Sequence, residues 1–387
     1  NPDGGSFAMV KDEMIEYTLK GPASQERARI RLMSALRENR FPQAILIDGP
    51  AGIGKKALAM ELAKVLQCES STNRPCGRCL GCRLASESGA TESWVIPLEA
   101  TEAKAKKAEE VSARSTAKTV EEIKQGYIEE IRKNPYRVDI FSTAAFISVE
   151  LIRNMTAAFA MKKDRVAAII IAEADRMNEA ASNAFLKTLE EVPPDTYFIL
   201  TTSSREKMLQ TIRSRCLALH LLPLTDEEVR KEVYRVAGED FDETLLTDDV
   251  VGIAEGSPGK ALYYAQHCNQ WNDLAIEFLR KSLLQDYTEL FFMLRDKSLD
   301  EAYDANRFLE ILSFLVADLL RELSHAELRM PTATAAVGLS NFPRLDATAL
   351  EVALVNIQEA MSKIDSRRIS TTMCLQTLAI KLFEGYK

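Results

Sequence analysis

Residues 49 to 56 read Gly-Pro-Ala-Gly-Ile-Gly-Lys-Lys, the spacing of a glycine-rich loop that wraps phosphate groups where a strand meets a helix. The short apolar pattern from Ala44 to Asp48 predicts a buried strand directly before this loop. Apolar residues at helical spacing from Ala57 to Leu66 predict a helix directly after it. This order of strand, loop and helix constrains the fold more than any other feature, because it requires a parallel sheet covered by helices.

The last position of the loop departs from the functional pattern, because Lys56 stands where Ser or Thr is needed. In a working loop the glycines, here Gly49, Gly52 and Gly54, let backbone N–H groups surround the phosphates. The loop lysine, here Lys55, reaches the outer phosphates, and the hydroxyl after it binds Mg²⁺. An ammonium group offers a metal ion no acceptor and adds a second positive charge beside its place. Lys56 therefore predicts a phosphate loop without a normal magnesium site.

A second support for magnesium is missing at the end of another predicted strand, Val166 to Ile171. Active ATPases with this loop use an aspartate from such a strand to hold the magnesium shell, and this chain has Ala172 at that position. Glu173 follows, where a water-activating base would stand, but without a metal ion a structural or interface carboxylate is the simpler interpretation. The loss of both the hydroxyl and the acid predicts that Mg-ATP is not bound productively.

Other segments before Pro223 complete the pattern of an α/β sheet. Tyr197 to Thr202 and Leu217 to Leu222 predict two further strands. The continuously apolar strand that begins at Val166 is typical of a parallel sheet covered on both faces. Asn178 predicts the N-cap of a helix between two of these strands. We therefore expect an α/β sheet domain over residues 11–222.

After Pro223 the periodicity is helical to the end of the chain. A capping box from Thr225 to Glu228 predicts the first helix, and Gly256-Ser257-Pro258-Gly259 predicts a break between helices. We expect a small helical domain over residues 223–268 and a longer helical domain over residues 269–387. Apolar stripes in the second of these, such as Phe308 to Leu319, favour the core of a helical bundle over a ligand site.

Four cysteines, Cys68, Cys76, Cys79 and Cys82, combine two overlapping Cys-x-x-Cys steps with a fourth thiol upstream. This spacing suits a closed tetrahedral Zn²⁺ site with no open position for catalysis. Four free surface cysteines or a redox Cys-x-x-Cys pair are the alternatives, but clustered exposed thiols would be a chemical liability. We therefore predict a structural zinc module over residues 68–82.

An Ala-, Glu- and Lys-rich stretch runs from about residue 99 to residue 136, and its acidic and basic side chains balance from Glu99 to Lys133. This balance indicates a solvated helical insertion rather than a basic arm. The residues of the stretch suggest no function for it.

The overall composition excludes two classes of protein. The formal net charge of −8 speaks against a surface built to bind nucleic acid along its whole extent, because that affinity comes from Lys and Arg. The longest purely apolar run, Val166 to Ala172, is far shorter than the roughly 20 residues that a membrane-spanning helix needs. With no targeting segment recognised, we expect a cytoplasmic protein.

Arg215 stands in the triplet Ser214-Arg215-Cys216 at the start of the last predicted strand. An arginine at a strand edge can reach across a subunit boundary to the γ-phosphate of a neighbour, as an arginine finger in trans. A surface salt bridge is the simpler interpretation if nothing else in the chain indicates an assembly.

These motifs together resemble the clamp-loader subunits of bacterial DNA polymerase III, a group within the AAA+ family. The resemblance extends from about residue 15 to residue 268. It is carried by Phe41-Pro42-Gln43-Ala44, the loop at 49–56, the four cysteines, Ala172-Glu173-Ala174-Asp175, Asn183-Ala184-Phe185-Leu186-Lys187-Thr188-Leu189-Glu190-Glu191, Thr201-Thr202 and Ser214-Arg215-Cys216. The Lys55-Lys56 pair and Ala172 are more similar to the delta-prime type, which does not use ATP, than to the tau/gamma motor type.

The resemblance implies an AAA+ sheet domain with an inserted zinc module, a helical lid and an oligomerising helical collar. It assigns the degenerate nucleotide site to the loop residues together with Ala172, Glu173 and Thr202. It also assigns Lys260 to this site, at the position where motor subunits carry a sensor arginine. The insertion at about 99–136 departs from the shorter members of the family.

The resulting hypothesis is a non-motor stator subunit of a clamp loader, which supplies Arg215 in trans and is not an enzyme by itself. Its implied partners are tau/gamma motor and delta subunits, the sliding clamp and primed DNA, within the DNA polymerase III holoenzyme. Two alternatives remain open. One is an active, tau/gamma-like AAA+ ATPase, and the other is a zinc-stabilised nucleic-acid-binding module, which the acidic net charge disfavours.

Overall fold

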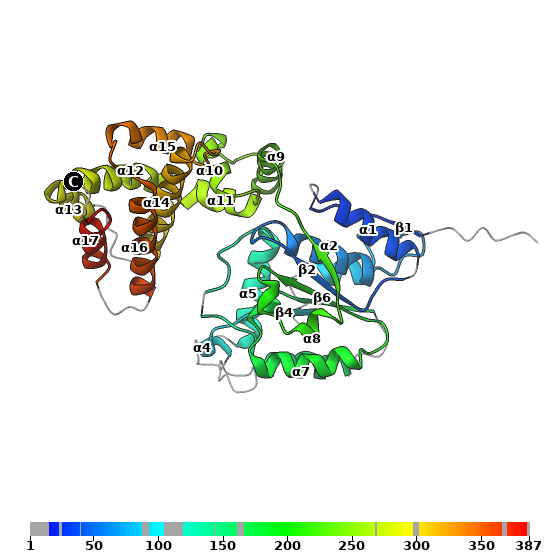
Figure 1. Cartoon of the computed structure of the whole chain (residues 1–387). Coiled ribbons are helices and arrows are strands. Elements are labelled where there is room, and N and C mark those ends of the chain that lie inside the picture. Colours follow the sequence, from blue (N-terminus) through cyan, green and yellow to red (C-terminus); the bar gives the residue numbers. More distant parts are fainter. Residues whose placement is uncertain are drawn as a thin grey trace, which may run out of the picture. The chain divides into compact units, whose positions relative to one another are not determined.

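The computed structural model describes residues 15–22, 25–38, 40–86, 93–103, 119–142, 144–160, 166–267, 269–296, 302–365 and 370–384. The chain divides into two compact units, residues 1–223 and residues 224–387 (Figure 1). None of the helices in these described segments combines the length and the apolar character needed to cross a lipid bilayer.

The first unit is built on a five-stranded parallel sheet with the strand order β4-β5-β6-β2-β7. In that order the strands are Trp94–Val95, Ala167–Ile171, Thr196–Thr202, Ala44–Asp48 and Leu217–His220. β2 lies inside the sheet, where Ile45 pairs with Ile199 of β6 on one side and with Leu217 of β7 on the other. The predicted parallel α/β sheet is confirmed. Because parallel strands end at the same edge, the residues after β2, β5 and β6 are brought close together.

The helices of the first unit cover this sheet. They are α1 (Glu26–Arg37), α2 (Lys55–Gln67), α3 (Leu80–Ser86), α4 (Ala100–Ala103), α5 (Val120–Lys133), α6 (Val149–Ala160), α7 (Glu179–Glu190) and α8 (Gln210–Arg213). α2 packs against β2, β5 and β6 and buries Leu58, Leu62 and Val65 completely. The predicted N-cap of α7 is confirmed, because the Asn178 side chain accepts the Ala181 N–H at 2.8 Å. A separate two-stranded sheet joins β1 (Glu16–Tyr17) to β3 (Asn73–Arg74).

The insertion contributes α4 and α5, while residues 104–118 lie outside the described residues. Thr119 and Glu122 form a capping box that fixes the start of α5. Ile128 and Ile131 of this helix are fully buried. α5 is therefore amphipathic and packed into the unit, and only one of its faces is solvated as the charge balance predicted.

The second unit is helical throughout its described residues. Its helices are α9 (Asp226–Ala237), α10 (Asp248–Ile253), α11 (Pro258–His267), α12 (Asn269–Leu284), α13 (Tyr287–Asp296), α14 (Ala302–Leu323), α15 (Pro331–Val337), α16 (Ala347–Asp365) and α17 (Thr371–Lys381). α9 starts at the predicted capping box of Thr225 and Glu228. The predicted break at 256–259 falls between α10 and α11. The stripe from Phe308 to Leu319 on α14 is buried, as expected for a bundle core.

A buried acid ties the early helices of the second unit to the later ones. The Asp249 carboxylate on α10 accepts the backbone N–H groups of Thr332 and Ala333 at 2.9 and 3.0 Å, at the start of α15. These bonds satisfy N–H groups that have no partner within the helix. The separation of this unit into a lid, residues 223–268, and a collar, residues 269–387, stays a prediction.

Candidate functional site

The glycine-rich loop adopts a backbone conformation that only its glycines allow. Gly49, Gly52 and Gly54 have φ values of +147°, +74° and +103°. A Cβ atom on Gly49 would lie 2.6 Å from the Leu221 carbonyl oxygen, and one on Gly54 would lie 2.9 Å from the Tyr136 ring. Larger residues at these two positions would therefore collide with their neighbours as well as strain the backbone.

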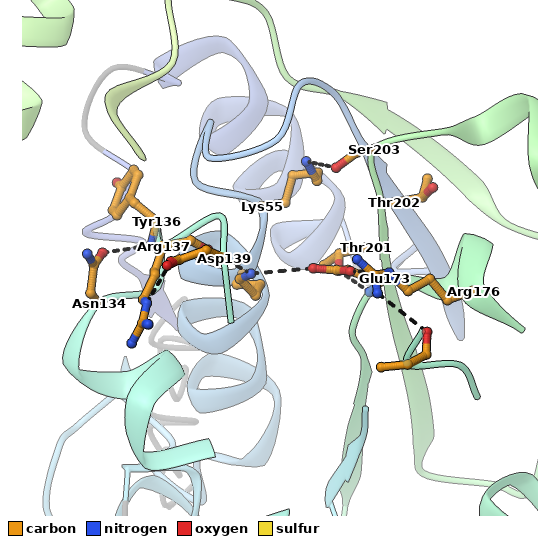
Figure 2. A network of polar contacts seen from close by, with 12 residues as sticks. Lys55, Asn134, Tyr136, Arg137, Asp139, Glu173, Arg176, Thr201, Thr202 and Ser203 are labelled. Atoms are coloured by element: carbon orange, nitrogen blue, oxygen red, sulfur yellow. Dashed lines mark hydrogen bonds and ion pairs between the residues drawn. The ribbon is translucent and has the colours of Figure 1, made fainter. Parts of the chain in front are cut away.

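Lys55 is the first residue of α2, and its side chain turns back onto the loop that carries it. Its ammonium Nζ donates to the carbonyl oxygens of Gly49 at 2.8 Å and Pro50 at 2.6 Å. It also donates to the Ser203 hydroxyl at 2.9 Å (Figure 2). An ammonium has three donors, so these bonds use all of them. Lys55 would have to give up this set in order to bind a phosphate.

Burial and, to a smaller extent, the neighbouring Lys56 ammonium together lower the pKa of Lys55 from 10.5 to about 7. Between these two pH values the unfolded chain keeps a proton that the folded chain has lost. Because the unfolded state binds more protons there, the contribution of Lys55 to the free energy of unfolding rises with pH across this window. Below about pH 7 Lys55 is protonated in both the folded and the unfolded chain, so its contribution to the free energy of unfolding no longer changes with pH.

Comparison of the wild-type protein with the Lys55→Met variant tests this pH dependence. We expect the difference in free energy of unfolding to shift in favour of the wild type as the pH rises from about 7 to about 9.5, because the wild type loses the penalty of a buried charge. Urea unfolding at several pH values measures the difference. A difference that stays constant over this window would contradict the lowered pKa of Lys55.

Lys56 lies between the loop, the end of β5 and the chain that follows α5. Its ammonium group donates to the Arg137 carbonyl oxygen at 3.2 Å and lies 3.8 Å from Glu173 Oε1. It also lies 5.8 Å from the centre of the Phe141 ring. Burial lowers the pKa of Lys56, and the Glu173 carboxylate opposes that shift. The residue that replaces the magnesium-binding hydroxyl thus supplies a positive charge of its own beside Glu173.

The residues after β5 and β6 form the other side of this site. Ala172 is fully buried and carries no carboxylate. Glu173 pairs with Arg176 at 2.6 Å (Figure 2). Glu173 also pairs with Lys56. The Thr202 hydroxyl donates to Asp175 at 2.6 Å. The structure therefore brings together the loop, Ala172, Glu173 and Thr202, as expected from the sequence. Glu173 is held by two cations, Lys56 and Arg176.

Little space remains at the mouth of the loop. The cavity there has a volume of about 30 Å³. Ligand pockets for drug-sized molecules have volumes of roughly 300–1,000 Å³, so this cavity has room for little more than a water molecule. It is lined by Ala51, Gly52, Gly54, Lys55, Lys56, Pro135, Arg137, Val138, Glu173, Thr201 and Ser203.

Arg215 lies after α8, and its side chain is partly exposed. The guanidinium group donates to Glu190 Oε1 at 2.9 Å and to the Thr211 carbonyl oxygen at 3.1 Å. Glu190 is the last residue of α7. These two bonds use some of the five donors of the arginine and fix the direction of its side chain. The remaining donors are available to an acceptor from outside the chain.

Lys260 belongs to α11 in the second unit. Its ammonium lies 3.7 Å from Glu255 Oε2, and its backbone N–H donates to the Ser257 hydroxyl at 3.2 Å. Its assignment to the nucleotide site remains a prediction from the resemblance.

The four predicted zinc ligands are brought together in the structure. The sulfur atoms of Cys68, Cys76, Cys79 and Cys82 all lie within 4.8 Å of one another. A tetrahedral zinc ion with metal–sulfur bonds of about 2.3 Å places its sulfurs about 3.8 Å apart, and the distance between the Cys68 and Cys79 sulfurs is 3.9 Å. The cluster thus fits a metal ion such as zinc.

The surroundings shift the pKa values of these cysteines in opposite directions. The backbone N–H groups of Arg78 and Cys79 lower the pKa of Cys76 to about 6. Burial instead raises the pKa of Cys82 to about 12. Four thiolates at this separation repel one another, so a deprotonated cluster needs a bound cation to balance its charge.

Sequence reasoning missed three contributors to the site. The Tyr136 ring packs against Gly54, and Ser203 accepts from Lys55. His220 Nδ1 lies 2.9 Å from Asp48 Oδ2, which links the ends of β7 and β2. The order of strands in the sheet would have suggested the last pair, because both residues end neighbouring parallel strands. No local pattern indicates the contact of Tyr136.

Comparison with known proteins gives a consistent result. The family model described as DNA polymerase III, delta subunit, matches residues 24–225. The DNA polymerase III subunit tau of Escherichia coli is 29% identical over 260 residues, which cover 66% of this chain and 34% of tau. The gamma subunit of Buchnera aphidicola is 32% identical over 228 residues, which cover 58% of this chain and 51% of gamma. The delta' subunit of Escherichia coli is 27% identical over 243 residues, which cover 62% of this chain and 59% of delta'. The matched region thus spans about a third to three fifths of these relatives.

Proposed function

This chain belongs to the family described as DNA polymerase III, delta subunit, and we propose that it is the non-motor, or stator, subunit of a DNA polymerase III clamp loader. Its partners would be motor subunits of the tau/gamma type, a delta subunit, the sliding clamp and primed DNA within the assembled complex. In bacteria such a role places the chain in the cytoplasm.

One observation carries the proposal, namely that the two lysines of the phosphate loop find their hydrogen-bond and ion-pair partners within the chain itself. Lys55 donates to two loop carbonyls and to Ser203, and Lys56 pairs with Glu173 where a motor would bind magnesium. Ala172 offers no carboxylate to a metal ion. ATP hydrolysis depends on magnesium to neutralise the charge that develops on the phosphates. A subunit with this loop contributes to the complex in a way other than turning over its own ATP.

In the proposed function, the chain contributes to ATP hydrolysis by a neighbouring subunit through Arg215. As an arginine finger in trans, it would stabilise the charge on the γ-phosphate held by an adjacent motor subunit. Its guanidinium is already directed by Glu190 and the Thr211 carbonyl. Fixing the side chain before assembly reduces the entropy lost when it meets the phosphate.

The four clustered cysteines are proposed to hold one structural zinc ion. A zinc ion with four protein sulfurs has no position left for a substrate or water, so it would stabilise the fold without taking part in hydrolysis. Cys68 is the C-cap of α2, and Cys82 lies on α3. The ion would therefore fasten the end of the loop helix to the next helix.

The isolated chain tests the proposal directly. We expect the purified protein to show no ATP hydrolysis above background, with or without primed DNA, because neither position 56 nor position 172 offers a magnesium ligand. Release of inorganic phosphate measures the turnover, and a Lys55→Ala variant is the matched control. Turnover in the wild type that disappears in Lys55→Ala would overturn the stator assignment.

The alternative is a motor subunit of the tau/gamma type. It is favoured by one finding, the similarity to tau and gamma relatives at 29% and 32% identity. It requires binding of Mg-ATP by this chain, whereas the stator proposal does not. Equilibrium binding of a fluorescent ATP analogue to the isolated chain, with and without Mg²⁺, separates the two, because only a motor subunit gains affinity when Mg²⁺ is added.

A further inference from the structure

The chain that follows α5 reaches the phosphate loop from a part of the sequence to which no role has been assigned. Residues 134–141, called the closing segment here, come directly after the insertion helix. They contribute Pro135, Arg137 and Val138 to the lining of the small cavity at the loop. Figure 2 shows Tyr136 and Arg137 of this segment on the same side of the loop helix as Asn134 and Asp139.

Tyr136 closes the segment against the backbone of the loop. Its side chain is 2% exposed, and its ring lies so near Gly54 that even a Cβ atom there would be only 2.9 Å away. Gly54 is the glycine directly before α2, where backbone N–H groups of a working loop face the phosphates. The buried ring of Tyr136 thus packs the closing segment directly against the backbone of the loop at Gly54.

The charged side chain of Lys56 connects the closing segment to the end of β5. Its ammonium joins the Arg137 carbonyl oxygen of the closing segment to the Glu173 carboxylate at the end of β5. The Phe141 ring, also in the segment, faces the same ammonium at 5.8 Å. In a working site a metal ion held by the side chain at this position would neutralise such an acid. Here a covalently attached cation does so and binds the segment at the same time.

The closing segment is itself held in place by short contacts. Arg137 pairs with Glu130 on α5 at 2.6 Å and with Asp139 at 2.8 Å. The Asn134 side chain accepts the Tyr136 N–H at 3.1 Å. Ile128 and Ile131 anchor α5 in the core, and Ile140 and Phe141 are buried. The segment is therefore a packed part of the first unit rather than a loop lying over it.

We propose that residues 134–141 are an internal plug that occupies the approach to the phosphate loop and keeps nucleotide out by steric closure, with the Lys56 ammonium as its resident cation. The missing magnesium ligands and the plug share Lys56, but the buried Tyr136 ring and the ion pairs of Arg137 with Glu130 and Asp139 hold the segment without it. Restoration of the ligands alone therefore leaves the loop closed. This inference rests on the contacts of the first unit and does not require the stator role.

The experiment uses the full chain and titration with a fluorescent ATP analogue in the presence of Mg²⁺. A Lys56→Thr/Ala172→Asp variant restores both magnesium ligands, and we expect no saturable binding by it. Addition of Tyr136→Ala and Arg137→Gly removes the ring and the ion pairs that hold the segment, and we expect this combined variant to gain at least about tenfold in affinity. Glu121→Ala, at an exposed position of α5, is the matched control in the restored background and should bind no better than its parent.

Two results would overturn the plug. One is tight Mg²⁺-dependent binding by Lys56→Thr/Ala172→Asp with the segment intact. The other is a combined variant that retains its circular dichroism spectrum and cooperative thermal unfolding but still binds no nucleotide. If the combined variant does not fold, Arg137→Gly alone in the restored background takes its place, with the same criteria. ATP hydrolysis by the wild type would instead contradict the stator proposal, so the two failures are distinguishable.

Discussion

Replacement of Arg215 by Ala is expected to lower the ATP turnover of a reconstituted clamp-loader complex by about 10³-fold at the site that this arginine serves. The observed total rate would fall less if other sites in the complex continue to work. The physical reason is the loss of a positive charge at the γ-phosphate, where negative charge accumulates during the transfer. Steady-state phosphate release by the complex, with primed DNA and clamp present, measures the effect.

The contact between Arg215 and Glu190 allows a second, more specific test of the finger role. Because Glu190 holds the guanidinium at 2.9 Å, Glu190→Gln should lower the turnover number by a smaller factor than Arg215→Ala while leaving the KM for ATP nearly unchanged. In an Arg215→Ala background the same change should have no further effect, because the two residues act on one step. Arg40→Ala, which removes an exposed arginine of the same unit, is the control for a general loss of charge. Normal turnover of an assembled Arg215→Ala complex would remove the finger role, whereas normal turnover of Glu190→Gln alone would remove only the positioning role.

Removal of zinc is expected to have the largest effect on stability. Structural zinc in small peptides contributes about 10–16 kcal/mol of binding free energy that is coupled to folding, so a four-cysteine site that loses its ion should lose its local structure. We expect about one zinc per chain in the purified protein by metal analysis. Cys76→Ser should abolish this zinc and lower the melting temperature by several degrees.

The effect should reach beyond the cysteines themselves. A Cβ atom on Gly81 would lie only 1.8 Å from the Gln67 carbonyl oxygen, so α3 is packed directly on the end of α2. Loosening of the module therefore frays the helix that starts at Lys55. Cys216→Ser is the matched control, because Cys216 lies outside the cluster and should leave the zinc content unchanged. A freshly purified, reduced protein without zinc would count against the metal site.

The sheet could be predicted from the sequence because its strands have local signals. β2 has the predicted bounds, and β5 and β6 each differ from prediction by one residue at the start. β4 was not predicted, because Trp94–Val95 is too short to show a pattern. The helical character of the second unit was also predictable, since its apolar stripes repeat over long segments.

The candidate site was predictable in its residues but not in its contacts. The loop, Ala172 and the four cysteines stand out by spacing alone. The partners of Lys56 do not, because Arg137 is 81 positions away in the sequence and follows an insertion with balanced charge. A flexible lysine side chain has many possible acceptors, and only the fold selects among them. For the same reason, the sequence could not show that Glu190 holds Arg215.

The position of α2 between two sites has a geometric consequence. The helix begins at Lys55 and its C-cap is Cys68, so its 13 residues form a rod about 20 Å long with the phosphate loop at one end and a cysteine of the cluster at the other. Each residue of an α-helix is rotated by about 100° about the helix axis relative to the residue before it. A change of one residue in the length of α2 would therefore rotate Cys68 by about 100° relative to the phosphate loop. The length of α2 fixes where Cys68 stands relative to the loop, and a loop that anchors the start of this helix has a structural role that requires no nucleotide.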